Sequence, residues 1–193
     1  MKEPWFYKFA RPIIWTFMKL VYRPVIIGKE NIPTDGGIVL AGNHTNNFDC
    51  LLLITSTKRM VHFLAKKELL DSKFRWIFKN MGIIPVDRSK KDSNALNKAI
   101  ESLKENKVIG IFPEGTINRT EDVTMPFKFG AVKMCLETNS TMIPFVITGK
   151  YKPFRKSVRI EFFKPYKLKN DLEKENEKLR NIVEQGIVKQ EEK

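Results

Sequence analysis

Short apolar runs alternate with longer amphipathic segments along most of the chain. The apolar runs occupy residues 25–28, 37–42, 61–65, 82–86, 108–112 and 142–148. The segments between them carry apolar residues at helical spacing and predict helices at about 47–57, 67–80, 92–105 and 128–139. Alternation of this kind is typical of a parallel sheet whose strands are joined by helices. We therefore predict an α/β fold with a mostly parallel sheet flanked by helices.

Three features refine this prediction toward the C-terminus. Pro144 lies inside an apolar run and predicts a bulge or a strand end, because proline cannot donate to a sheet ladder. Residues 150–169 are rich in lysine and arginine, and the alternating pattern at 158–163 predicts a final edge strand. The tail from Asn170 has mixed charges and helical spacing, which predicts a surface helix without chemistry.

The segment at residues 5–22 is aromatic, basic and amphipathic. Its apolar positions at helical spacing are Trp5, Phe6, Phe9, Ile13, Phe17 and Leu20. Lys8, Arg11 and Lys19 lie toward the other side, and Pro12 predicts a break or kink near Arg11. Such a helix either lies on a membrane surface or packs as a terminal helix on its own domain.

Composition and charge narrow the classes of protein. The chain has 193 residues, 42% of them apolar and 30% charged, which fits one globular domain. Lysine and arginine outnumber the acidic residues by 35 to 22, so nucleic acid, anionic lipid or a phosphorylated substrate would be attracted. No stretch reaches the ~18 uncharged apolar residues of a spanning helix, so any membrane contact is expected at the surface.

Cysteine and histidine counts exclude two further classes. The two cysteines are too few for a disulfide framework, and no secretory cleavage site follows the N-terminus, which indicates a reducing, cytoplasmic setting. With only His44 and His62 and no Cys-x-x-Cys pair, no metal site is predicted.

The first motif that carries chemistry is GNHTNNFD at residues 42–49. It lies between a predicted strand and a predicted helix, where α/β folds build their sites. His44 and Asp49 are five residues apart, so they cannot share a helical face, and His44 is expected in the loop before Asp49. The Asp49 carboxylate could then orient one imidazole nitrogen and leave the other as a base. Alternatively, Asn46 and Asp49 cap the helix and His44 is a lone polar residue.

Two further apolar runs also end in polar groups. GIIPVDR at residues 82–88 brings Arg88 to a predicted strand end, where it could hold a phosphate. VIGIFPEGT at residues 108–116 breaks into a turn whose backbone N–H groups suit an anion. Glu114 and Gly115 have plain alternatives, as a turn-stabilising residue and as a residue that allows an unusual backbone angle.

Taken together, four ordered blocks resemble the glycerolipid acyltransferases, specifically the lysophosphatidic acid acyltransferase family. The blocks are NHTNNFD, GIIPVDR, FPEGT and MIPFVIT, and the resemblance runs from about Gly28 to Gly149. It also covers AKKEL at residues 65–69 and PFKFGA at residues 126–131. The resemblance implies that His44 is the general base and Asp49 its orienting partner.

The resemblance also implies a set of substrate-binding residues. These are Lys66, Arg88, Glu114, Gly115, Thr116 and Lys128. One position departs from the family pattern, in which arginine follows Glu-Gly-Thr, because this chain has Ile117 there. We expect Arg119 to substitute for that arginine.

The implied reaction moves a fatty acyl group from acyl-coenzyme A or acyl carrier protein to lysophosphatidic acid, which gives phosphatidic acid. No metal or cofactor is implied. Residues 1–23 are expected to be a membrane-association segment and residues 24–193 the acyltransferase domain, peripheral on an anionic membrane at the cytoplasmic face of the cell. The sequence does not distinguish the donors, nor lysophosphatidic acid from another lysophospholipid or glycerol phosphate.

Three other interpretations stay open from the sequence. The lysines, arginines and aromatic residues at 150–167 could belong to a nucleic-acid-binding module, although no recognised motif of that class is present. Cys50 beside Asp49 could carry the acyl group covalently. A membrane-bound protein could also keep the fold without catalysis, against which the His44 and Asp49 pair argues.

Overall fold

A parallel sheet forms the centre of the molecule in the computed structural model, which describes residues 4–71, 73, 75–87 and 93–192. Within these residues the strands are β1 (Val25–Ile27), β2 (Ile38–Gly42), β3 (Val61–Lys66), β4 (Ile84–Val86), β5 (Val108–Ile111), β6 (Thr141–Gly149) and β7 (Val158–Phe162). They are arranged in the order β1-β7-β6-β2-β5-β3-β4. All neighbouring pairs are parallel except β6 and β7. The predicted α/β fold with a mostly parallel sheet is confirmed.

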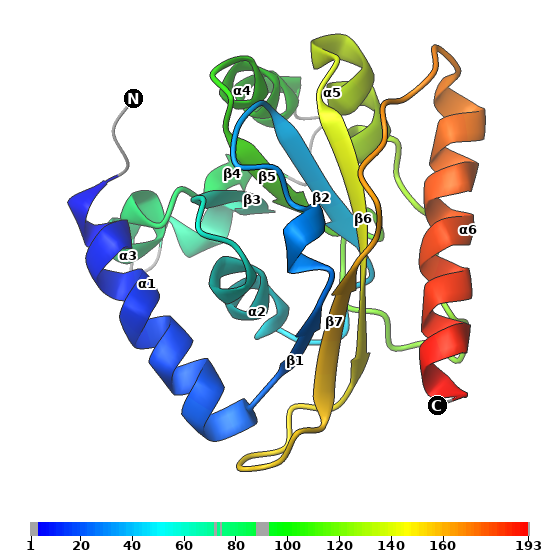
Figure 1. The fold of residues 1–193 in the computed structure, drawn as a ribbon. Coiled ribbons are helices and arrows are strands. Elements are labelled where there is room, and N and C mark those ends of the chain that lie inside the picture. The colour runs from blue at the N-terminus through cyan, green and yellow to red at the C-terminus, as the bar shows by residue number, and fades with distance from the viewer. Residues whose placement is uncertain (1–3, 72, 74, 88–92, 193) are drawn as a thin grey trace.

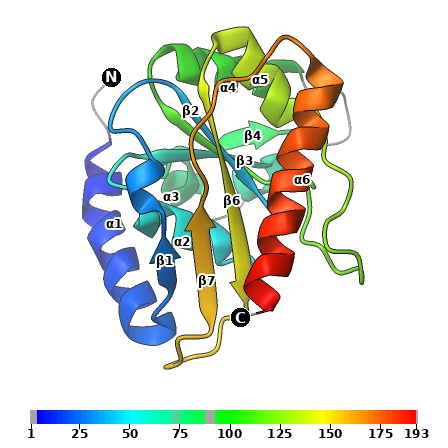
Figure 2. The ribbon, with the colours of Figure 1, turned by 45° about the vertical axis from the view of Figure 1, so that its right-hand side comes forward.

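Helices cover both faces of this sheet (Figures 1 and 2). They are α1 (Trp5–Phe17), α2 (Asp49–Ser56), α3 (Arg75–Asn80), α4 (Ser93–Lys104), α5 (Gly130–Thr138) and α6 (Leu172–Glu191). A π-helical segment, η1 (Met18–Tyr22), continues α1, and short 3-10 turns lie at η2 (Lys29–Asn31) and η3 (Lys67–Leu69). No helix among the described residues is long and apolar enough to span a bilayer.

The alternation of side chains along β2 separates two hydrophobic cores. Ile38 and Leu40 belong to the core that packs under α1 and α2. Val39 and Ala41 point to the opposite core, which packs under α4, α5 and α6. All four side chains are fully buried. A central strand buried on both faces reads as a continuous apolar run, which is the pattern that predicted it.

The sequence correctly predicted every strand of the sheet but misplaced one of them. β7 is not an edge strand, because β1 adds to it in parallel, from Val25 beside Arg159 to Ile27 beside Glu161. The short β1 therefore forms the edge, and short edge strands expose few unpaired backbone groups to other chains. β7 is thus the last strand in the sequence but not the edge strand of the sheet.

Pro144 does not end its strand. β6 runs through it, between β2 and β7, and Pro144 stands opposite Ala41 of β2. Its carbonyl accepts from the Phe163 amide, and the pairing then shifts by one residue to reach the bridge between Met142 and Tyr166. The irregularity that proline predicted lies on the partner segment, as a bulge after β7.

The helix at the N-terminus is likewise not broken at Pro12. α1 is assigned continuously through it, and the irregular π-helical segment begins only at Met18. Pro12 is exposed, so the carbonyl that loses its amide partner can be hydrated. Arg11 instead fixes the helix, because its guanidinium donates to the carbonyls of Ile54 and Thr57 at the end of α2.

Candidate active site

His44 and Asp49 are paired at the carboxyl-end edge of the sheet. His44 follows β2, Asp49 is the first residue of α2, and 2.9 Å separates the His44 Nδ1 from the Asp49 Oδ2. The Asp49 side chain is fully buried, whereas the His44 side chain keeps 16% of its surface exposed. The imidazole therefore lies between a buried carboxylate and the outside of the protein.

The topology of the sheet explains why His44 and Glu114 meet at the carboxyl ends of β2 and β5. β2 and β5 are neighbours, but the chain after β2 enters α2 on one face of the sheet, and the chain after β5 enters α5 on the other. The two connections therefore part at the carboxyl ends of these strands and leave a crevice there. His44 comes from the first connection and Glu114 from the second.

Besides the His44 ring, four protein groups donate hydrogen bonds to the Asp49 carboxylate. The amides of Thr45 and Asn46 donate to Oδ2 at 2.7 and 2.8 Å. The Tyr151 hydroxyl donates to Oδ1 at 2.7 Å, and the Thr45 hydroxyl lies 3.2 Å from the same atom. Because every partner is a donor, the carboxylate accepts from Nδ1–H, which leaves the lone pair on the His44 Nε2 free.

The contacts of Asp49 fit both interpretations drawn from the sequence. Its Oδ2 accepts from the Asn46 amide while the Asn46 side chain accepts from the Phe48 amide, which is the reciprocal pattern of a helix N-cap. The same carboxylate binds the Thr45 amide and the His44 ring. Asp49 therefore stabilises the start of α2 and also orients the imidazole, and the catalytic role of the pair stays a prediction.

The backbone of His44 is clamped on both sides. Its amide donates to the Glu114 Oε1 at 2.9 Å, and its carbonyl accepts from the Asn118 amide at 2.9 Å. One residue earlier, the buried Asn43 side chain forms a pair of 2.8 Å hydrogen bonds with both backbone groups of Ile147 in β6. The imidazole stacks on Phe112, with 4.0 Å between ring centroids. The ring can therefore rotate little.

Glu114 serves the same clamp. Its Oε2 accepts from the Met125 amide at 2.9 Å, so its two oxygens join the His44 loop to the segment after β5. Burial raises the pKa of this carboxyl, although the two amides and the His44 ring oppose that shift. Each oxygen keeps a second lone pair, so the contact with substrate predicted for Glu114 stays a prediction.

Gly115 and Lys128 are brought together beside this loop. Gly115 has a φ of +76°, and its amide closes the turn onto the Phe112 carbonyl. A Cβ on Gly115 would lie 2.6 Å from the Lys128 Nζ, so the ammonium group occupies the space that the glycine leaves. A positive charge thus stands directly on the FPEGT turn.

The other predicted binding residues are less defined. Thr116 and Arg119 are exposed on the loop after Gly115, and Lys66 is exposed at the end of β3, on the same edge of the sheet. Arg88 lies outside the described residues. Whether these side chains contact a substrate stays a prediction.

Two hollows border this region. A cavity of about 170 Å³ has His44, Glu114, Asn118, Ile147 and Ile187 in its lining. A larger hollow, of about 660 Å³, lies between residues 122–126 and α6 and does not include His44.

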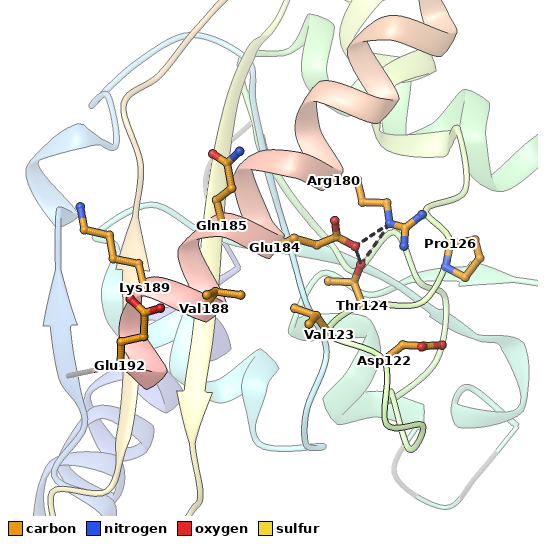
Figure 3. A pocket seen from close by; sticks show the side chains of 10 residues that line it. All are labelled: Asp122, Val123, Thr124, Pro126, Arg180, Glu184, Gln185, Val188, Lys189 and Glu192. Atoms are coloured by element: carbon orange, nitrogen blue, oxygen red, sulfur yellow. Dashed lines mark hydrogen bonds and ion pairs between the residues drawn. The ribbon is translucent and has the colours of Figure 1, made fainter.

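Figure 3 shows how the larger hollow is held together. The Thr124 hydroxyl donates to Glu184 at 2.6 Å, and the Arg180 guanidinium donates to Glu184 at 2.9 Å. α6, to which the sequence assigned no chemistry, therefore anchors the segment whose Met125 amide binds Glu114.

A covalent route through Cys50 is not supported by its surroundings. Burial, and secondarily the charge of Asp49, raise the pKa of its thiol to about 12. The nucleophilic thiolate is therefore almost absent near neutral pH. Among the described residues no three histidine, cysteine or acidic side chains gather as a metal site.

Comparisons with known proteins identify the family of the segment that carries this site. The acyltransferase family model matches residues 23–148, which include His44, Asp49, Glu114 and Gly115. The chain belongs to the acyltransferase family. The resemblance stated from the sequence blocks is thereby confirmed.

Curated members of the acyltransferase family include similar sequences. A 1-acyl-sn-glycerol-3-phosphate acyltransferase of Bacillus subtilis is 33% identical over 145 residues, which are 74% of this chain and 71% of that protein. The protein of that name from Borreliella burgdorferi is 36% identical over 69% of this chain and 54% of its own length. Against the Borreliella protein and one from Saccharomyces cerevisiae, the chain spans about half the relative's length.

A solved acyltransferase structure shares the fold. The 1-acyl-sn-glycerophosphate (LPA) acyltransferase PlsC of Thermotoga maritima superposes with a TM-score of 0.78 at 23% identity, over 97% of this chain and 82% of that one. At this identity the likeness supports the fold alone.

Several residues of this acyltransferase site were missed from the sequence. Tyr151 lies about a hundred residues from Asp49. It belongs to a stretch whose many basic residues indicated anion binding and not a contact with Asp49. Asn43 could have been suspected, because a polar residue between a buried strand and His44 needs partners. Nothing in the sequence indicated that Met125 would bind Glu114 or that Phe112 would stack on His44.

The raised pKa of Glu114 predicts a pH-dependent effect of its substitution. An acid whose folded pKa lies above its unfolded value of about 4.5 contributes stability below that pH, and loses the contribution as the pH rises through the folded value. In Glu114→Gln the contribution is absent. The unfolding free energy of the wild type minus that of the variant should therefore fall from pH 4.5 toward neutrality, as measured by urea denaturation. The exposed carboxyl of Glu137 provides the control Glu137→Gln, and a Glu114 difference that stays constant would contradict the prediction.

Proposed function

We propose that this acyltransferase moves a fatty acyl group from a thioester to the free hydroxyl of lysophosphatidic acid, which gives phosphatidic acid. The observation that carries the proposal is the pair of His44 and Asp49, whose geometry leaves the imidazole Nε2 without a hydrogen-bond partner among the described residues. The names of the Bacillus and Borreliella relatives support the choice of acceptor. The donor is acyl-coenzyme A or acyl carrier protein.

The site residues support direct transfer by general-base catalysis. The His44 Nε2 takes the hydroxyl proton as the alcohol oxygen attacks the thioester carbonyl. The C–S bond then breaks, and the imidazolium returns the proton to the leaving thiol. The buried Asp49 carboxylate stabilises the imidazolium between these steps and prevents the ring from turning. The proton taken from the alcohol ends on the thiol, and a C–O bond replaces the C–S bond, so no covalent enzyme intermediate is needed.

The proposed phosphate site is the turn at Gly115. Lys128 places a positive charge against the turn, and Arg119 is exposed on the loop that follows. The Asn118 amide binds the His44 carbonyl, so the same loop connects the phosphate site with the base. Lys66 and Arg88 are proposed to approach the phosphate from the neighbouring strand ends. A phosphate held there would leave the acceptor hydroxyl near the imidazole.

The proposed location is the surface of an anionic membrane, on its cytoplasmic face, with residues 1–23 as the association segment. Along α1 and η1 the residues Phe9, Ile13 and Leu20 are 60%, 54% and 61% exposed. Trp5 and Trp76 are exposed as well and contact each other at 6.4 Å between ring centroids. A contiguous apolar surface of this kind is typical of interfacial binding.

Product analysis tests the reaction. Purified protein is incubated with lysophosphatidic acid, other lysophospholipids and glycerol phosphate, each with both donors, and products are identified by mass spectrometry. His44→Ala should lower the rate by at least ~100-fold, because loss of a general base removes about 10²–10⁴-fold. His62→Asn is the matched control and should keep its activity. Unchanged turnover in folded His44→Ala, or exclusive acylation of another acceptor, would contradict the proposal.

A second experiment tests the phosphate site. Lys128→Gln should raise the KM for lysophosphatidic acid by about 10-fold or more with little change in kcat, because a charge-assisted hydrogen bond contributes ~1.5–3 kcal/mol. Arg119→Ala should have a similar effect if it substitutes for the arginine of the family pattern. Lys133→Gln, an exposed lysine on α5, is the control. An unchanged KM in Lys128→Gln or Arg119→Ala would exclude that side chain from the site.

A third experiment tests the membrane face of α1. Removal of residues 1–22 is a poor probe, because Tyr7, Met18 and Tyr22 belong to the hydrophobic core. The triple variant F9S/I13S/L20S changes exposed side chains only. Its binding to anionic vesicles should fall at least tenfold, since each apolar side chain contributes ~1.5–3 kcal/mol when buried. L172S/V188S on α6 is the control, and equal vesicle binding by all three proteins would rule out the α1 contact.

A further inference from the structure

The loop between β6 and β7, residues 150–157, projects beyond the edge of the sheet that carries His44. Figures 1 and 2 both show this loop extending past the strand ends, close to the end of α1. The Phe154 amide donates to the Val21 carbonyl, so the tip of the loop is attached to η1. The tip of the loop therefore lies next to the part of η1 that carries the exposed Leu20.

The charge of this loop has a single sign. Its sequence is KYKPFRKS, and its four basic residues are exposed while it contains no acidic residue. The four are Lys150, Lys152, Arg155 and Lys156. Among the described residues none of them forms an ion pair. Their charges are thus available to an anionic partner.

Phe154 stands at the tip of the loop in a costly conformation. Its side chain keeps 69% of its surface exposed. Its φ of +60° lies in the left-handed region, which bulky residues rarely adopt and where glycine or asparagine costs less. The hydrogen bond from the Phe154 amide to Val21 holds the backbone angle, whereas a residue so exposed packs little against the rest of the chain. An apolar environment outside the protein would account for an aromatic side chain at this position.

The loop is held in this shape by its own hydrogen bonds. The Lys150 amide donates to the Ser157 carbonyl at 2.8 Å, and the Ser157 hydroxyl donates to the Lys150 carbonyl at 2.7 Å. The Arg155 amide reaches the Lys152 carbonyl at 3.3 Å. Phe154 is therefore presented by a closed loop and not by a loose strand of chain, so binding requires little additional ordering.

We propose that the β6–β7 loop is a second membrane contact, in which Phe154 enters the interface of an anionic bilayer and the four surrounding cations bind lipid headgroups. The inference rests on the proposed membrane location and adds to it a site separate from α1. A bilayer fits the loop better than single-stranded nucleic acid, because the Phe154 amide binds Val21, and the residue before Val21 is Leu20, a second exposed apolar side chain. A nucleic-acid site would not need that second apolar side chain.

The contact would be connected with the catalytic pair at its base. Tyr151, the second residue of the loop, donates to Asp49, and its ring packs against Tyr22 of η1 with 5.5 Å between centroids. The two membrane contacts thus meet at one tyrosine that binds the orienting carboxylate. Docking of both would place the His44 and Asp49 pair next to the bilayer that holds the lysolipid.

Vesicle sedimentation of the full chain tests the proposal. The loop variant K152E/R155E/K156E and the control K98E/K133E/K164E change the net charge equally, and all six side chains are exposed. With vesicles of phosphatidylcholine and phosphatidylglycerol, the loop variant should bind at least ~10-fold more weakly than the control, since each cation near such a surface contributes about 1 kcal/mol. Phe154→Ser should weaken binding about tenfold on its own, and also with vesicles of phosphatidylcholine alone.

Equal losses in the two charge variants would show that only the overall field acts, and would overturn the proposal. Unchanged binding by Phe154→Ser, or competition of single-stranded oligonucleotide for the loop in preference to vesicles, would overturn it as well. Acyl transfer to monomeric, short-chain lysophosphatidic acid should stay within about twofold in the loop variant. Activity on the monomeric acceptor tests the proposed function separately, so failure of either proposal can be recognised.

Discussion

The buried carboxylate of Asp49 is the group on which the rest of the site depends. An ionised side chain without solvent contact is stable only when its lone pairs are satisfied, and here the amides of Thr45 and Asn46, the Tyr151 hydroxyl and the His44 ring satisfy them. Those donors come from the loop after β2 and, in the case of Tyr151, from the loop after β6. The carboxylate therefore joins three parts of the chain, and the charge that orients the base also determines the fold of the loop around it.

A second carboxylate, that of Glu114, also holds this loop, but it binds the backbone and not the imidazole. Within the described part of the chain Glu114 accepts from two backbone amides, those of His44 and Met125, so it connects the loop after β2 with the segment after β5. That segment is in turn attached to α6 through Thr124 and Glu184. Asp49 binds the imidazole of His44, whereas Glu114 binds the backbone amide of the same residue. His44 can be rigid although it lies in a loop, because buried groups hold the backbone on both sides of it.

The sequence predicted the parts of this structure that depend on local pattern. Apolar runs identified the strands, and the separation of His44 and Asp49 placed one in a loop and the other at a helix start. What it could not reveal arises from contacts across the chain. β1 became the edge only through pairing with β7, and Tyr151 reaches Asp49 only because β6 ends beside α2. Spacing likewise gave no means to tell that both Glu114 oxygens bind amides of other segments. Local pattern predicts elements and candidate residues, whereas partners far apart in sequence require the folded chain.

The position of the His44 and Asp49 pair relative to the exposed apolar surfaces follows from the strand directions. Because β2, β5 and β6 are parallel, their carboxyl ends bring His44, the Gly115 turn and the β6–β7 loop to one edge of the sheet. η1 reaches that edge too, since the Val21 carbonyl accepts from Phe154 and Tyr22 packs on Tyr151. An amphiphilic acceptor would keep its acyl chain in a bilayer while its hydroxyl and phosphate reach the site. If the proposed reaction and membrane contacts hold, a sheet that brings His44, Lys128 and the apolar surfaces to one edge would allow the transfer without complete extraction of the lipid.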